Sequence, residues 1–355
     1  MKKTLLTLLL TFTCFVSNGQ NCFKGKIEEV KQLTERPLAV IIYEEDENYV
    51  KRLEKKIAKS NKKKEKYQKE LNDYKNHISY FNKNIKDVVT EYWKLNKTHN
   101  IQYFTNKQVE DLIKNKSNSF AILNLTIDVV MADLNTLSTM DIYAITYGAS
   151  EKNRKKAVYK NHITNVNYNL PGYADKELKK AIEKLKKERE NGPTYLSKEN
   201  MITSLVLSQK YIEKAINLNK KVSFEDFAEE EMKRNCSKLK GNTILFQEAI
   251  VHGKIKNELQ SLLPKAKTEL VSPNRIAEAV ANKEDVLIGF PIIKKLMKQR
   301  GGFGPVTTST VIPVTHKVIM NAKTKEIIGF IPHSGITSYS YFKKKDFKKL
   351  NEQCN

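Results

Sequence analysis

The sequence predicts an α/β fold made of two tandem units, each with the element order β-α-β-α-β-β-β-α. Three observations indicate this: short apolar runs typical of buried strands alternate with helical patterns, the alternation occurs twice in one order, and 355 residues exceed one ordinary domain. The predicted first unit covers residues 20–197 and carries a long helical insertion at about 46–98. A helical bridge at 198–234 leads to the second unit at 235–355.

In the first unit, five runs rich in apolar and β-branched residues predict strands. They lie at 37–43, 101–105, 120–126, 141–147 and 156–164. Helical patterns predict a short helix at 108–113 and a charged helix at 175–190, which ends at the stop signal Asn191-Gly192-Pro193. The bridge begins after Ser197, a suitable N-cap, and has apolar residues at helical spacing.

The second unit repeats this order. Its predicted strands lie at 242–247, 268–271, 285–290, 311–320 and 326–332, and its predicted helices at 255–263, 273–282 and 343–352. Ser272 and Pro273 are a good N-cap and first residue for the middle helix. The last two strands form a hairpin around residues 321–325, and a turn centred between Lys323 and Thr324 places His316 opposite Ile331.

The turn of this hairpin carries a family resemblance. The element order resembles the amino-terminal α/β domain of TolB-like and curli-secretion-channel-like envelope proteins, here in two copies, whose hairpin turn has an Asp-x-x-Thr-Gly-like signature. The matching stretch is Asn321-Ala-Lys-Thr324-Lys325-Glu326, with Lys325 where the family often has Gly. The resemblance implies the architecture more than the function, and the β-propeller repeats that follow this domain in TolB are missing.

The helical insertion of the first unit has a heptad stripe, with apolar residues at alternating spacings of four and three. The stripe consists of Tyr67, Leu71, Tyr74, Ile78, Phe81, Ile85, Val88, Tyr92 and Leu95. The run at 59–64 is polar where the stripe should continue, so it predicts either a helical hairpin or a loop before a helix of about 30 residues.

Two interpretations of the stripe stay open. If the long helix covers its own sheet, nearly the whole stripe is buried in the monomer. If it binds a partner, then several of Tyr67, Leu71, Tyr74 and Ile78 are exposed as a contiguous apolar patch.

The amino terminus predicts a cleaved signal peptide at residues 1–19. Lys2 and Lys3 form a basic segment, residues 4–16 are apolar, and small or polar residues precede Gln20. We therefore expect an exported, periplasmic or secreted protein without a transmembrane segment after cleavage, since the apolar run is too short to cross a bilayer.

Three cysteines follow the signal peptide: Cys22, Cys236 and Cys354. In an oxidising compartment they allow one disulfide, and any of the three pairings is possible. None has a second Cys or a His at ligand spacing, so the sequence predicts no metal site.

The net charge of +23 comes from 56 Lys and only seven Arg. Arg is the residue suited to bidentate recognition of phosphates and bases, so this composition, together with export, argues against a nucleic-acid partner. An anionic polymer or lipid surface is a possible partner, and the alternative is compositional drift on a solvated surface.

The sequence lacks the common catalytic signatures, such as the G-x-S-x-G elbow, the Walker loop and H-E-x-x-H. It predicts no catalytic residues and no cofactor, and leaves enzyme activity uncertain. The one glycine cluster, with Arg300, Gly301, Gly302 and Gly304, is a candidate ligand or anion loop.

Together these features predict an exported, non-catalytic interaction or scaffold protein of the cell envelope with an envelope protein partner. One alternative is a Lys-rich binder of an anionic envelope polymer or lipid surface. The other is an enzyme with an unrecognised site.

Overall fold

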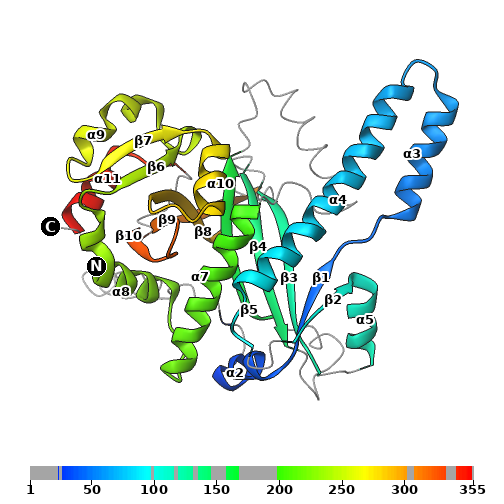
Figure 1. Cartoon of the computed structure of the whole chain (residues 1–355), viewed down its shortest axis with the longest axis horizontal. Helices are drawn as coiled ribbons and strands as arrows, with labels where there is room; N and C mark the ends of the chain where they lie inside the picture. The colour runs from blue at the N-terminus through cyan, green and yellow to red at the C-terminus, as the bar shows by residue number, and fades with distance from the viewer. Residues whose placement is uncertain are drawn as a thin grey trace, which may run out of the picture.

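Two five-stranded mixed sheets form the framework of the protein (Figure 1). The structure is a computed structural model that describes residues 23, 26–96, 100–115, 119–130, 135–144, 157–167, 198–301, 308–332 and 341–353. The predicted signal peptide and the predicted helix at 175–190 lie outside these residues.

The first sheet has the strand order β2-β1-β3-β4-β5. Its strands are β1 (Leu38–Ile42), β2 (Ile101–Thr105), β3 (Ala121–Val130), β4 (Asn135–Ala144) and β5 (Ala157–Asn167). β1 lies parallel to β2 and β3, and the later pairs β3–β4 and β4–β5 are antiparallel. The parallel centre explains why β1 is a continuous apolar run, because helices cover both faces of such strands.

The second sheet has the order β10-β9-β8-β6-β7. Its strands are β6 (Thr243–Gln247), β7 (Lys267–Val271), β8 (Leu287–Gly301), β9 (Thr308–Asn321) and β10 (Ile327–Ile331). β6 is parallel to β7 and β8, and the remaining pairs are antiparallel. Read from its parallel edge, this sheet has the same strand order and directions as the first. The predicted α/β class is confirmed, and the shared topology supports the duplication, which stays a prediction.

Helices connect and cover the strands. They are α2 (Ile27–Glu35), α3 (Glu47–Lys59), α4 (Lys64–Tyr92), α5 (Asn106–Lys114), α7 (Lys198–Asn217), α8 (Phe224–Asn235), α9 (Leu259–Leu262), α10 (Pro273–Ala281) and α11 (Lys344–Gln353). The helix predicted at 255–263 is corrected, since the chain forms a 3-10 segment at Gly253–Glu258 and then only the short α9. α2 was not predicted.

The bridge helix α7 joins the two units into one hydrophobic core. Its residues Met201, Leu205 and Ile212 are fully buried, in a cluster that includes Leu123 of the first sheet and Ile288 of the second. Smaller clusters fill the outer faces, around Ile122 in the first unit and around Phe246 in the second.

A buried ion pair fixes the last helix on the second sheet. The Lys317 ammonium on β9 lies 2.5 Å from Oδ2 of Asp346 in the first turn of α11, and both side chains are less than a tenth exposed. The same oxygen accepts a hydrogen bond from the backbone N–H of Lys343. Burial lowers the pKa of the Lys317 ammonium.

Cys236 takes part in a disulfide. Its sulfur lies 3.4 Å from the backbone oxygen of Gln353, the residue before Cys354. Cys22 and Cys354 themselves lie outside the described residues.

Within the described part of the chain, no helix combines the length and apolar character that a membrane crossing requires.

Gly289 marks a close contact inside the second unit, because a Cβ atom there would meet the ring of Phe246 and would lie 3.2 Å from Ile319. We expect Gly289→Ala to lower the free energy of unfolding by about 1–3 kcal/mol through overpacking. Gly253→Ala is the matched control, since a Cβ there meets no atom within 4 Å. Urea denaturation measures both, and equal midpoints for the two variants would contradict the close contact.

Candidate functional site: a basic helical arm

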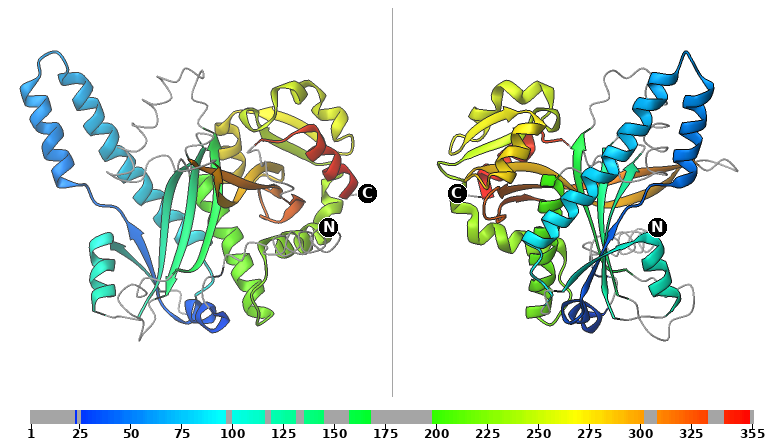
Figure 2. Two further views of the ribbon diagram at one scale, coloured as in Figure 1. Left: turned by 180° about the vertical axis from the view of Figure 1, so that it is seen from behind. Right: turned by 45° about the vertical axis from the view of Figure 1, so that its right-hand side comes forward.

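α3 and the first half of α4 form a helical hairpin that projects from the body of the protein (Figures 1 and 2). Residues 47–75 are called the basic arm below. The break between the two helices falls at Ser60–Lys63, within the predicted polar run, and of the two predicted alternatives the chain forms the helical hairpin. The second half of α4 belongs to the body, where Phe81, Ile85 and Val88 are at most 2% exposed in the shared core.

The apolar side chains of the stripe are mostly buried within the monomer. Leu71, Tyr74 and Ile78 are 7%, 7% and 6% exposed, and Tyr67 is half-buried. α3 packs along α4 and buries its own Leu53 completely. Of the two interpretations of the stripe, burial within the monomer is therefore the one that fits Leu71, Tyr74 and Ile78, and these three residues form no exposed apolar patch.

Tyrosines fix the base of the arm. The Tyr74 hydroxyl accepts a hydrogen bond from the backbone N–H of Asp46, and its ring packs edge-on against Tyr49 with the centroids 4.8 Å apart. The Tyr49 hydroxyl donates to Oε1 of Glu70 on α4 at 2.9 Å. Asp46 also caps α3, because its carboxylate accepts the N–H groups of Asn48 and Tyr49. These contacts hold the two helices in one relative position.

The exposed surface of the arm is strongly cationic. Residues 51–69 contain ten Lys or Arg and two Glu, so a stretch of 19 residues has a net charge of +8 out of the chain's +23. All ten cationic side chains are exposed. In the described part of the chain, Lys51 is the one member of this set that lies within 4.0 Å of a carboxylate, that of Glu47 at 3.1 Å.

On the surface around α7 and α8, by contrast, several cations have carboxylate partners. The pairs are Lys214–Glu230 at 2.5 Å, Arg234–Glu231 at 2.8 Å and Lys238–Glu326 at 2.7 Å. The arm thus combines high charge density with little neutralisation. Such a surface creates a positive potential that attracts polyanions.

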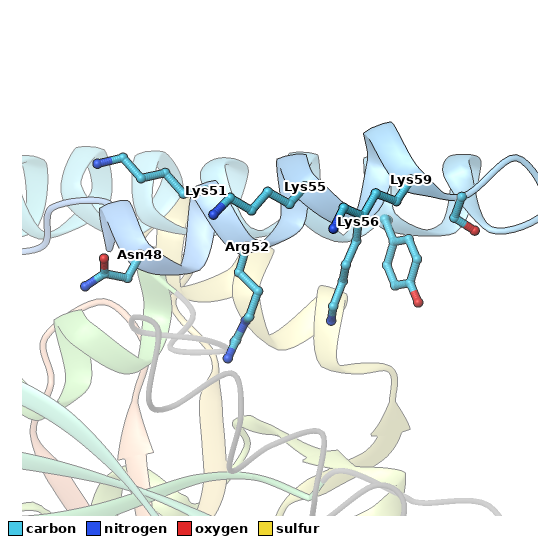
Figure 3. A pocket seen from close by; sticks show the side chains of 8 residues that line it. Asn48, Lys51, Arg52, Lys55, Lys56 and Lys59 are labelled. Carbon is cyan, nitrogen blue, oxygen red and sulfur yellow. The ribbon is translucent and has the colours of Figure 1, made fainter.

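A groove of about 550 Å³ runs along one side of α3 (Figure 3). It is lined by Asn48, Lys51, Arg52, Lys55, Lys56, Lys59, Ser60 and Tyr67. The Arg52 guanidinium lies 5.0 Å from the ring centroid of Tyr49, and the Lys56 ammonium lies 5.2 Å from that of Tyr67. A cation–π contact orients a cation without cancelling its charge. The groove therefore presents positioned cations that are ready for an anionic ligand.

The predicted glycine loop is only partly within the described residues. Arg300 and Gly301 belong to strand β8, where they pair with Ser309 and Thr308 of β9. These two residues are thus strand rather than loop, which corrects the prediction for them. Gly302 and Gly304 lie outside the described residues.

A second cavity, of about 480 Å³, lies between α7 and α8. Burial lowers the pKa of the Lys210 ammonium and raises the pKa of the nearby Glu213 carboxyl. However, the ammonium donates to the backbone oxygens of Thr324 and Lys325, and no Ser, Cys or His is among the described residues that line this cavity. The arrangement stabilises the β9–β10 turn.

Metal-ligating side chains do not gather in groups of three or more His, Cys, Asp or Glu within the described ranges. The sequence contained the signal for the basic arm, the lysine run at 59–66, but the exposure of the arm and its groove depend on how α3 packs on α4.

Comparisons of the chain with protein-family models, curated proteins and solved structures find no match.

Proposed function

We propose that this chain is an exported, non-catalytic interaction protein that binds an anionic polymer of the cell envelope through its basic arm. The observation that carries the proposal is the group of ten exposed cations on the projecting arm, nearly all without a carboxylate partner in the described residues. Polyanion binding releases condensed counterions and needs only such charges in an accessible place.

Export is supported by two independent features. The amino-terminal pattern at 1–19 is typical of a cleaved signal peptide. Cys236 is disulfide-bonded, which is usual in oxidising compartments and rare in the cytosol. The family resemblance at residues 321–326 also favours the envelope.

The proposal favours the anionic polymer over an apolar protein partner because Leu71, Tyr74 and Ile78, which such a partner would contact, are buried within the monomer. Lipid is the less favoured anionic surface. The arm tip at 59–66 has no apolar residue, whereas interfacial binding grows with buried apolar area as well as with charge.

The test is a charge-neutral arm with a matched control. The arm variant carries Lys→Gln at 55, 59, 62, 63 and 64, and the control carries Lys→Gln at 220, 233, 240, 254 and 348, which are exposed lysines of the body. Both lose five charges. We expect the arm variant to bind labelled heparin, a sulfated linear polymer, at least about tenfold more weakly, with increasing salt weakening the wild type steeply.

Three outcomes are decisive in this titration. If the arm variant binds heparin more weakly while the control keeps the wild-type affinity, the arm is supported as the binding surface. Equal losses in both variants would refute it, since net charge alone would then explain the binding. Tight binding to phosphatidylglycerol vesicles without binding to heparin would replace the polymer with a membrane.

A further inference from the structure

We infer that the groove along α3 holds a linear polyanion that lies parallel to the helix and whose charges repeat about every 6 Å, the spacing of residues four apart at 1.5 Å per residue. This inference rests on the proposed function. It specifies which part of the arm makes the contact and what form the ligand has.

Apart from Tyr67 of α4, the lining residues of the groove fall into two rows with a spacing of four. One row is Asn48, Arg52, Lys56 and Ser60, and the other is Lys51, Lys55 and Lys59. Residues four apart lie on the same face of a helix, one above the other. Figure 3 shows the side chains of Arg52 and Lys56 extending to the same side of α3. A chain of regularly spaced anions can therefore meet one cation at each turn.

The cations of the first row are held in place before any ligand binds. Tyr49 beneath Arg52 is fixed by its contacts with Tyr74 and Glu70, and the Lys56 ammonium lies over the ring of Tyr67, which α4 supplies. Ordering a long side chain on binding costs conformational entropy, so prior positioning increases affinity. The tip lysines Lys62 and Lys63 have no such ring contact among the described residues.

The hydrogen-bonding groups of Asn48 and Ser60 flank the two cations of the first row, one turn beyond each. The Ser60 hydroxyl already accepts from the N–H of Lys63 but keeps its own proton to donate. The full row covers the length of α3, about 20 Å for its 13 residues. Phosphodiester polymers and acidic polysaccharides both supply linear series of anions, and the ligand series below separates them.

The experiment compares two variants that each lose two charges from the arm. Arg52→Gln with Lys56→Gln removes the positioned cations of the groove, and Lys62→Gln with Lys63→Gln removes tip cations that are equally exposed. The probes are base-free oligophosphodiesters of increasing length, oligosaccharides of uronic acid, and phosphatidylglycerol vesicles. Circular dichroism verifies that both variants keep their helices.

We expect the groove variant to lose at least about fivefold in affinity for the preferred oligomer, and its plot of log K against log salt to become shallower by about 1.4, at about 0.7 per contact with a single-stranded polyanion. The tip variant should lose less than about twofold. Affinity should rise steeply until the oligomer has about four charges, the number that spans α3.

Failure of this inference differs from failure of the proposed function. If the tip variant loses as much as the groove variant, or if length has no effect, the ligand contacts the arm as a flat charged surface and the groove inference is wrong while the arm remains the binding site. If the wild-type protein binds neither oligomer nor heparin, both are wrong.

Discussion

Replacing Leu71 and Ile78 together with lysine should lower the free energy of unfolding of the arm by at least about 4 kcal/mol, because both changes place a charge without a partner in an apolar contact. The two native side chains, on the helix against which α3 packs, are 7% and 6% exposed. A drop in the melting temperature and loss of helical circular dichroism measure the effect. Hydrogen exchange within residues 47–75 shows whether the arm unfolds before the body does.

Asn72→Lys with Ser79→Lys is the control for this change. It adds the same two charges seven residues apart on the same helix, at positions that are exposed. We expect it to leave the melting temperature almost unchanged and to retain polyanion binding. If the Leu71 and Ile78 variant is equally stable, these side chains are not buried within the monomer, and an apolar partner for the stripe becomes possible again.

The strands and the break between α3 and α4 were predictable because their patterns have local causes. β1 is apolar along its whole length and β6 at its three central residues, as parallel strands covered on both faces require. The break between α3 and α4 was visible because six polar residues interrupt the stripe. Ser272 and Pro273 predicted the start of α10, and the Ser272 hydroxyl accepts the N–H of Arg275 as a cap should.

Features that depend on partners distant in the sequence were not predictable in this way. A heptad stripe has the same sequence pattern whether the chain itself or another protein covers it. The burial of Leu71 and Tyr74 within the monomer could therefore not be predicted from the stripe. The predicted pairing of His316 with Ile331 is wrong by one residue. Ile331 pairs with Lys317, because a bulge between Ile327 and Gly329 shifts the register.

The arm could be anticipated only in part. Lysines are common along the whole chain, so the run at 59–66 did not by itself mark this segment as a binding surface. The cation–π contacts join Arg52 to Tyr49 on one helix but Lys56 to Tyr67 across two. That second contact exists only once α3 folds back on α4.

The turn that carries the family resemblance contains a lysine in an unfavourable place. Lys325 has φ of +58°, a conformation that favours glycine, and its side chain is only 3% exposed. Its ammonium donates to the backbone oxygen of Ala322, and burial lowers its pKa from 10.5 to about 8. Lys283 and Lys210 lower this pKa further, while Glu91 raises it.

This shift makes stability depend on pH in a defined direction. Between about pH 8 and 10.5 the unfolded chain binds a proton at Lys325 that the folded chain has released. The free energy of unfolding therefore rises with pH through this window, and below it the buried charge costs about 3 kcal/mol, at 1.36 kcal/mol per pKa unit.

Lys325→Gly should consequently stabilise the protein at pH 7 by about 1–3 kcal/mol, because it removes both the buried charge and the strain of a positive φ. The lost burial of the apolar lysine stem offsets part of this gain. The same change should remove the rise in stability between about pH 8 and 10.5. Denaturant titrations across this range measure both effects. Lys323→Gly, at an exposed position of the same turn, is the control. It removes a solvated charge, so it should neither stabilise the protein at pH 7 nor change how stability depends on pH. If Lys325→Gly lowers the stability at pH 7 instead, the bond to Ala322 and the packing of the stem outweigh the buried charge, and the turn requires its lysine.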